Sequence, residues 1–145
     1  MISKTDVEIV KKYWFSIAMH KDGVVTSFYQ ELFEKHPEYR KYFKNDLEVQ
    51  HEKLARMINI VINGADVWDL IEPEIVKLGR FHATIADFGK TDYQNIVNTL
   101  LNVMERYKGY EDERAREAWS NLFAVISDTM MQAAEEYLAE NKTGS

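Results

Sequence analysis

The sequence predicts an all-α domain, and three observations lead to that conclusion. Apolar residues recur at spacings of three and four along almost the whole chain, as in Leu54, Met57, Ile58 and Val61, which is the period of a helix with one buried face. No segment alternates polar and apolar residues in the manner of a strand. With 145 residues, 46% of them hydrophobic, the chain is long enough for one core.

Residues that end helices or form turns divide this pattern into segments: Asp22-Gly23, Pro37, Asn45-Asp46, Asn63-Gly64, Pro73, Gly89 and Gly109. Two helix starts also have the spacing of a capping box, Thr5 with Glu8 and Thr91 with Gln94. In chain order we therefore expect helices over about 4–20, 23–35, 37–43, 47–63, 73–84, 92–107 and 112–139.

Short helices lie among longer ones, and none of them carries a sustained heptad repeat. This combination disfavours an up-down bundle and favours helices that cross at steep angles around a central object. We expect a single domain over residues 1–140 and a disordered tail over 141–145.

Composition excludes several classes of function. The net charge of −6 disfavours a surface that follows nucleic-acid phosphates. The absence of cysteine excludes disulfides, thiolate haem ligation and cysteine-held iron–sulfur clusters. The chain has no glycine-rich phosphate loop, zinc-ligand spacing or serine-triad pattern, and no apolar run long enough to span a membrane. The first twenty residues mix charged and apolar side chains, unlike a signal peptide, so we expect a cytoplasmic protein.

Among the four histidines, His82 continues an apolar helix stripe and should face the interior. Ile71, Ile75 and Leu78 precede it on this stripe, and Ile85 follows. An interior imidazole is either a core residue that makes a hydrogen bond or a metal ligand, and neutral imidazole is the usual axial ligand of haem iron. The stripe alone leaves both interpretations open.

Two polar side chains are expected to face the same interior from other helices. Tyr29 follows Phe28 in an apolar stripe, and Gln50 lies one helical turn before Leu54. A buried hydroxyl and a buried amide need partners, and both groups could donate hydrogen bonds to a bound diatomic gas.

These residues resemble the globin family, and in particular the globin domain of bacterial flavohaemoglobins and single-domain bacterial haemoglobins. The resemblance covers nearly the whole chain. It is carried by the order and separation of Phe28-Tyr29, Leu32-Phe33, Pro37-Glu38, Phe43, Gln50, Leu54, the run 78–82 (LGRFH), Tyr93 and the run 117–119 (EAW).

The resemblance implies a haem b group and assigns a role to several residues. His82 would be the proximal iron ligand, Phe43 would pack on the porphyrin, and Tyr29 with Gln50 would form the distal hydrogen-bonding pair, with Leu54 narrowing access. The further residues expected around the haem are Phe28, Lys53, Leu78, Arg80 and Tyr93.

On the proximal side, the family pairs a tyrosine with a glutamate of the last helix, which increases the imidazolate character of the histidine. Tyr93 matches the tyrosine. Counted without gaps from Trp119, however, Ala134 stands at the place of the glutamate, and Glu135 lies beside it. The proximal carboxylate is therefore in doubt.

The distal register has an alternative, because His51 follows Gln50 and a rotation of about 100° would exchange them. We favour Gln50, since its register turns Leu54 inward and turns Ala55 and Asn59 away from the core.

The same region contains candidates for a sixth iron ligand in the resting protein: His51, Gln50, Lys53 and Tyr29. Lys53 and Arg80 are each expected either to meet a haem propionate or to lie in solvent.

Three functions follow as hypotheses. The first is reversible binding of dioxygen or other diatomic gases. The second is conversion of nitric oxide to nitrate with a separate reductase, because the flavohaemoglobin resemblance does not extend to a flavin domain. The third is a globin-like sensor or interaction module without haem. Oligomeric state is left open.

Overall fold

The computed structural model describes residues 2–43, 47–85, 87–107 and 113–143. Six α-helices and three short 3₁₀ helices follow one another in these ranges: α1 (Lys4–Ile17), η1 (Ala18–His20), α2 (Lys21–Lys35), η2 (Pro37–Tyr42), α3 (Leu47–Asn63), η3 (Ala65–Val67), α4 (Trp68–His82), α5 (Lys90–Arg106) and α6 (Glu113–Thr143). The described ranges contain no strand, which confirms the predicted all-α class.

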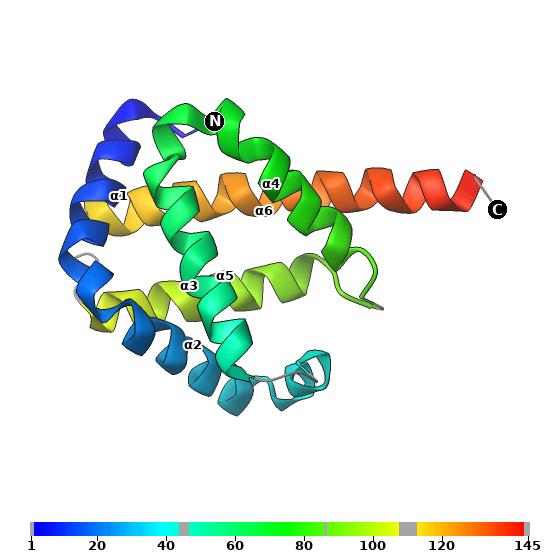
Figure 1. Cartoon of the computed structure of the whole chain (residues 1–145), viewed down its shortest axis with the longest axis horizontal. Helices are drawn as coiled ribbons and strands as arrows, with labels where there is room; N and C mark the ends of the chain where they lie inside the picture. Colours follow the sequence, from blue (N-terminus) through cyan, green and yellow to red (C-terminus); the bar gives the residue numbers. More distant parts are fainter. Residues whose placement is uncertain (1, 44–46, 86, 108–112, 144–145) are drawn as a thin grey trace.

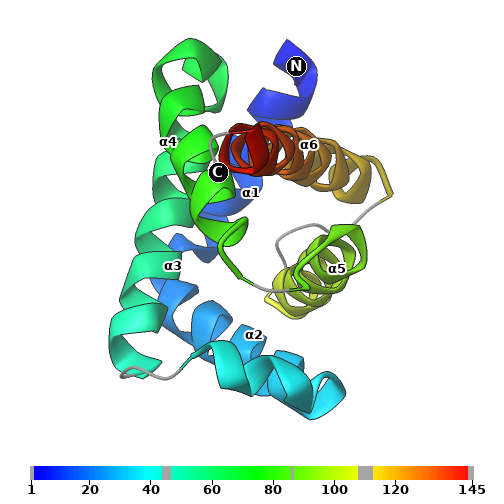
Figure 2. The same cartoon turned by 90° about the vertical axis from the view of Figure 1, so that its right-hand side faces the viewer.

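The helices cross at steep angles. α5 and α6 run in opposite directions along the molecule, and α3 and α4 cross over them (Figure 1). Seen from one end, α3 and α4 line one side and α5 and α6 the other, with α2 below (Figure 2). This arrangement agrees with the expectation of helices packed around a centre rather than in a parallel bundle.

Both predicted capping boxes are wrong, each by about two residues. The hydroxyl of Ser3 accepts a hydrogen bond from the backbone N–H of Asp6, at 3.1 Å, so α1 begins before Thr5. At the start of α5, the backbone N–H of Gly89 donates to Asp92 Oδ2, at 2.7 Å. The cap residue lies two positions upstream of the predicted one in both cases, with the side-chain oxygen supplied by Ser3 at α1 and by Asp92 at α5, and the spacing of Thr5 and Thr91 did not reveal this.

α4 begins at Trp68, five residues before its predicted start, so the assignment of Pro73 as the first helical residue is wrong. Proline within a helix removes one backbone hydrogen bond. The additional turn contributes Trp68 and Ile71, which are only 9% and 7% exposed. Burial of these two side chains stabilises the turn against the loss of the hydrogen bond at proline.

α6 continues to Thr143, past the predicted end at 139 and into the segment expected to be a disordered tail. Its last turns contact α4. The guanidinium of Arg80 donates to Glu140 Oε2, at 2.7 Å, and lies 5.1 Å from the centre of the Tyr137 ring. These tertiary contacts support a helix end that local sequence propensity does not reveal.

The central part of α6 forms the middle of the core. Ala118, Trp119 and Leu122 are fully buried. Farther along, α6 touches α4 backbone to backbone at Gly79, where an added Cβ atom would lie 2.7 Å from the Cα atom of Met130. Only glycine permits this approach, so the contact restricts how α6 can rotate against α4.

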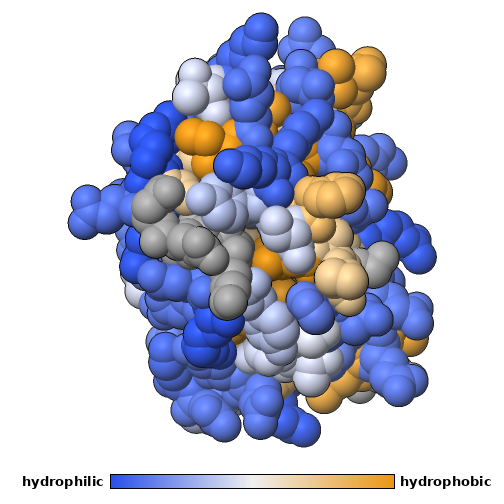
Figure 3. Space-filling view, turned by 90° about the vertical axis from the view of Figure 1, so that its left-hand side faces the viewer, coloured by the Kyte–Doolittle hydropathy of each residue, from blue (hydrophilic) through white to orange (hydrophobic). Residues whose placement is uncertain are grey.

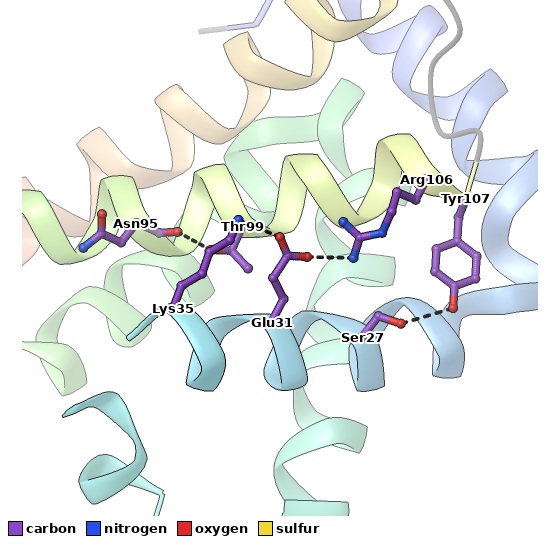
Figure 4. A network of polar contacts seen from close by, with 7 residues as sticks. All are labelled: Ser27, Glu31, Lys35, Asn95, Thr99, Arg106 and Tyr107. Atoms are coloured by element: carbon purple, nitrogen blue, oxygen red, sulfur yellow. Dashed lines mark hydrogen bonds and ion pairs between the residues drawn. The ribbon is translucent and has the colours of Figure 1, made fainter. Parts of the chain in front are cut away.

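A polar network ties α2 to α5 (Figure 4). Glu31 accepts from Arg106 at 2.6 Å and from Lys35 at 2.7 Å, while the hydroxyls of Ser27 and Tyr107 lie 3.2 Å apart. Burial would raise the pKa of Glu31, but the bonds from Arg106 and Lys35 outweigh it and lower the pKa below 4.5. The carboxylate is therefore stabilised in its charged form.

On the face beside α1, the surface is largely hydrophilic, with separate hydrophobic patches rather than one continuous apolar area (Figure 3). Within the described ranges, no helix combines the length and the apolar character that crossing a membrane requires.

Candidate functional site

His82 is the last residue of α4, and its ring is oriented by its own helix. Its Nδ1 atom lies 2.7 Å from the backbone oxygen of Leu78, one turn earlier. A carbonyl oxygen can only accept, so Nδ1 carries the proton and Nε2 keeps its lone pair. Burial lowers the pKa of His82 below 6.5, against the opposing effect of the Leu78 hydrogen bond. Near neutral pH the ring is uncharged, and Nε2 can donate its lone pair to a metal.

Two aromatic rings pack beside His82 and form a proximal cluster with it. The ring centres of Phe88 and Tyr93 lie 5.4 and 6.2 Å from that of His82 and 5.1 Å from each other. Asp87, directly before Phe88, has a φ of 63°, the left-handed conformation that turns the chain between α4 and α5. This turn directs Phe88 back onto the histidine.

Tyr29 lies at the centre of a second group of rings, the distal cluster. Its ring centre is 5.0 Å from that of Phe28, 5.9 Å from Phe33, 5.4 Å from Phe43 and 4.8 Å from His51. Burial raises the pKa of Tyr29 to about 12, so its hydroxyl keeps its proton at neutral pH. The distal cluster therefore contains a permanent hydrogen-bond donor.

The end of η2 connects the two clusters through adjacent residues. Tyr42 contacts the proximal cluster, with its ring 6.3 Å from Phe88. Phe43 contacts the distal cluster, with its ring 5.5 Å from Phe33. The short segment between α2 and α3 thus borders both clusters. A flat aromatic group could pack on these rings.

The histidine of α3, rather than the glutamine before it, stacks on Tyr29. The rings of His51 and Tyr29 are nearly parallel, at 9°. Gln50 is half-buried one position earlier. The expectation that Ala55 and Asn59 turn away from the core is wrong, because Ala55 is 8% exposed and Asn59 accepts a hydrogen bond from the Trp14 indole at 3.2 Å. Residues that belong to both possible registers of α3 therefore contact the core.

The other predicted residues divide into two groups. Phe28 is buried in the distal cluster, and Leu54 and Leu78 are half-buried against the core. Lys53 is exposed. The guanidinium of Arg80 is engaged by Glu140 and Tyr137 of α6.

Sequence reasoning missed three contributors to the site: Tyr42, Phe88 and the Leu78 carbonyl. Tyr42 is adjacent to the predicted Phe43, and an aromatic residue six positions after His82 was a visible signal for Phe88. The Leu78 carbonyl could have been identified because residues four positions apart in a helix lie one turn apart.

A haem group fits this donor set. His82 offers one unprotonated nitrogen, which would serve as the single protein ligand of a metal whose remaining ligands come from a macrocycle. His51 Nε2 and the Tyr93 hydroxyl are buried without a hydrogen-bond partner among the described residues. Buried polar atoms normally have partners, so the unpaired nitrogen beside Tyr29 is consistent with a ligand on that side.

The described residues also form two surface grooves. The larger, of about 770 Å³, is formed by the start of α1 and the start of α4 and includes none of the predicted site residues. The smaller, of about 260 Å³, lies between α5 and α6 and is lined in part by Tyr93. The chemistry of the donor groups, rather than groove size, therefore identifies the candidate site.

Comparison with known proteins gives consistent results. A family model described as Globin matches residues 26–130. The chain is 28% identical over 144 residues to a flavohemoprotein from Bacillus cereus, covering 97% of this chain and 35% of that protein. It is 22% identical over 143 residues to a flavohemoprotein from Halalkalibacterium halodurans, covering 96% and 34%. The chain thus spans about a third of the length of these curated relatives.

Solved structures show the same fold. An engineered carbene transferase, made from a Rhodothermus marinus protein assigned as a nitric oxide dioxygenase, has a TM-score of 0.86 at 19% identity, covering 98% of this chain and 99% of the other. A bacterial globin from Campylobacter jejuni has a TM-score of 0.81 at 16% identity, covering 94% and 99%. The family model covers more than half of the chain, and we conclude that this protein belongs to the globin family.

Proposed function

We propose that this globin holds haem b through Nε2 of His82 and reversibly binds dioxygen or another small diatomic gas. One observation carries the proposal: the 2.7 Å contact between Nδ1 of His82 and the Leu78 oxygen leaves Nε2 as the free donor. Membership of the globin family supports haem as the cofactor and a diatomic gas as the ligand. Haem iron supplies the coordination position for the gas.

The aromatic rings hold the flat group and exclude water. Phe88 and Tyr93 would pack beside the iron ligand, and Phe43 would pack on the porphyrin from the corner after η2. Leu54 and Leu78 would complete the apolar lining, and Lys53, which is exposed, is the candidate for a propionate.

Tyr29 would donate the principal hydrogen bond toward the gas, because its hydroxyl is protonated and lies in a dry cluster. We propose His51 as the second polar group, since its ring stacks on Tyr29 and its Nε2 atom is unpaired. Gln50 is the alternative that the family resemblance favours. The same region contains the candidates for a resting sixth ligand.

A haem titration monitored in the Soret region tests the proposal. The parent should bind one equivalent of haem and give a Soret band, and His82→Ala should lose tight binding or change the spectrum of both oxidation states. His20→Ala, a surface histidine, is the matched control and should behave as the parent. If the parent gains no Soret band with added haem, only a sensor or interaction module remains.

A second candidate function is nitric oxide dioxygenation. The specific support is that the relatives are flavohemoproteins and that one structural neighbour is assigned as a nitric oxide dioxygenase. In this reaction nitric oxide and dioxygen give nitrate, and one electron from a partner reductase restores the ferrous state. Repeated nitrate formation with a reductase present would support it. A single stoichiometric turnover under the same conditions would leave gas binding as the function.

A further inference from the structure

The short helix η2 is followed directly by Phe43 of the distal cluster, but little of η2 itself is anchored in the core. Within Pro37–Tyr42, all six residues of which are described, Tyr39 is the only buried side chain, at 4% exposed. A 3₁₀ helix also has poorer hydrogen-bond geometry than an α-helix. The position of Phe43 therefore depends strongly on what holds Tyr39.

The hydroxyl of Tyr39 is held by two side chains of α5. It donates to Asp92 Oδ1 at 2.6 Å and accepts from the side-chain amide of Asn95 at 2.9 Å. Burial, together with the neighbouring carboxylate, raises the pKa of Tyr39 to about 12, so the hydroxyl keeps the proton that it donates. The hydroxyl thus both donates and accepts in contacts that join η2 to α5.

The second oxygen of Asp92 holds the turn between α4 and α5. Its Oδ2 atom accepts from the backbone N–H of Gly89 at 2.7 Å. Gly89 directly follows Phe88, whose ring centre lies 5.4 Å from that of His82. One carboxylate therefore holds both the turn that carries the proximal ring and, through Tyr39, the helix that leads to the distal cluster.

We infer that Asp92 and Tyr39 are positioning residues for haem, and that their hydrogen bond holds the proximal and distal clusters at a fixed separation. Breaking the bond should leave His82 on the iron but let the two clusters move apart, so that haem leaves faster. The inference rests on the proposed role of His82. Neither Asp92 nor Tyr39 has to touch haem, because each acts through a ring that it positions, Phe88 or Phe43.

Amide hydrogen exchange tests the two arms of the carboxylate separately. It is followed by NMR in the haem-loaded chain, as the ferrous carbon monoxide complex. Asp92→Ala should remove the protection of the Gly89 amide, because Oδ2 accepts from it. Tyr39→Phe breaks only the bond to Oδ1 and should leave that amide protected. A Gly89 amide that exchanges equally fast in the parent and in Asp92→Ala would overturn the inference.

The rate of haem loss tests the functional consequence. Transfer of haem from the ferric protein to excess apomyoglobin is followed in the Soret region. Tyr39→Phe should lose haem about 10 times faster than the parent, the size expected when a buried hydrogen bond is broken. Asp92→Asn keeps one oxygen acceptor and should lie between the parent and Asp92→Ala. The double variant should lose haem no faster than Asp92→Ala alone, because the two residues act as one unit.

Tyr107→Phe is the matched control, because it removes a tyrosine hydroxyl that joins α2 to the opposite end of α5, where it meets Ser27 (Figure 4). Its haem loss should equal that of the parent. Equal acceleration in Tyr107→Phe and Tyr39→Phe would overturn the inference, since a general loss of stability would explain both.

A Tyr39→Phe rate equal to that of the parent would also overturn the inference. The ferric and ferrous spectra of Tyr39→Phe should match those of the parent, because His82 remains in place. Failure of the proposed function is distinguishable, since the parent would then bind no haem and give no Soret band.

Discussion

The proximal and distal clusters differ in what determines their geometry. His82 is oriented by a carbonyl four residues earlier in the same helix. The spacing of one helical turn therefore fixes the orientation of its ring and the nitrogen that carries its proton. The distal pair joins Tyr29 of α2 to His51 of α3, and their contact depends on how α3 is rotated about its axis. The comparison teaches that the geometry of the proposed metal ligand is a local property of the sequence, whereas that of the proposed gas-contacting pair depends on tertiary packing.

The largest expected effect lies in the distal cluster. Tyr29→Phe removes the protonated hydroxyl while keeping the ring contacts, so dioxygen should leave about 10 to 100 times faster, the size expected for a hydrogen bond to a charged acceptor. Stopped-flow release from the ferrous protein measures it. Phe33→Leu, in the same cluster, is the control. A release rate equal to that of the parent would remove Tyr29 from the gas site.

A smaller effect distinguishes the two registers of α3. If His51 is the second polar group, His51→Ala should speed gas release by about 3 to 10 times, as expected for one neutral hydrogen bond, and Gln50→Ala should change it less. The same rate measurement on both variants decides. The opposite order would assign the role to Gln50 and would mean that the distal geometry follows the family pattern.

The smallest expected effect concerns the network that ties the helix of Tyr29 to the helix of Tyr93. Because the pKa of Glu31 is lowered from 4.5, its stabilising contribution is present above pH 4.5 and is lost as the pH falls through the folded value. Glu31→Gln should therefore reduce the free energy of unfolding by about 1 kcal/mol at pH 7 and by less at pH 3.5.

Urea denaturation at the two pH values measures this difference. Glu34→Gln, exposed on the same helix, is the control and should change stability little at either pH. An equal loss at both pH values would show that the charge of Glu31 is not what ties α2 to α5.

Much of the fold could be predicted because amphipathic stripes are long and local. α3 covers residues 47–63, as the stripe through Ile58 and Val61 predicted. The start of α4 could not be predicted, since Trp68 and Ile71 are stabilised by burial in the core, whereas the local pattern favoured Pro73 as the first helical residue. The end of α6 depends in the same way on Arg80.

The same distinction between local pattern and tertiary packing applies to the candidate site. Tyr29 and Phe43 were both expected around the haem, and their rings lie 5.4 Å apart. The stacking of His51 could not be foreseen, because adjacent residues differ by only about 100° of helix rotation and Ala55 and Ile58 are both buried.

The most direct test of the central claim is chemical rescue of the proposed iron ligand. His82→Gly removes the ring from the end of α4, and added imidazole should restore the parent's Soret band and its ferrous carbon monoxide spectrum at saturating concentration. His36→Gly should need no imidazole. A parent-like spectrum for His82→Gly without imidazole would contradict the account, because the iron would then be held by another residue.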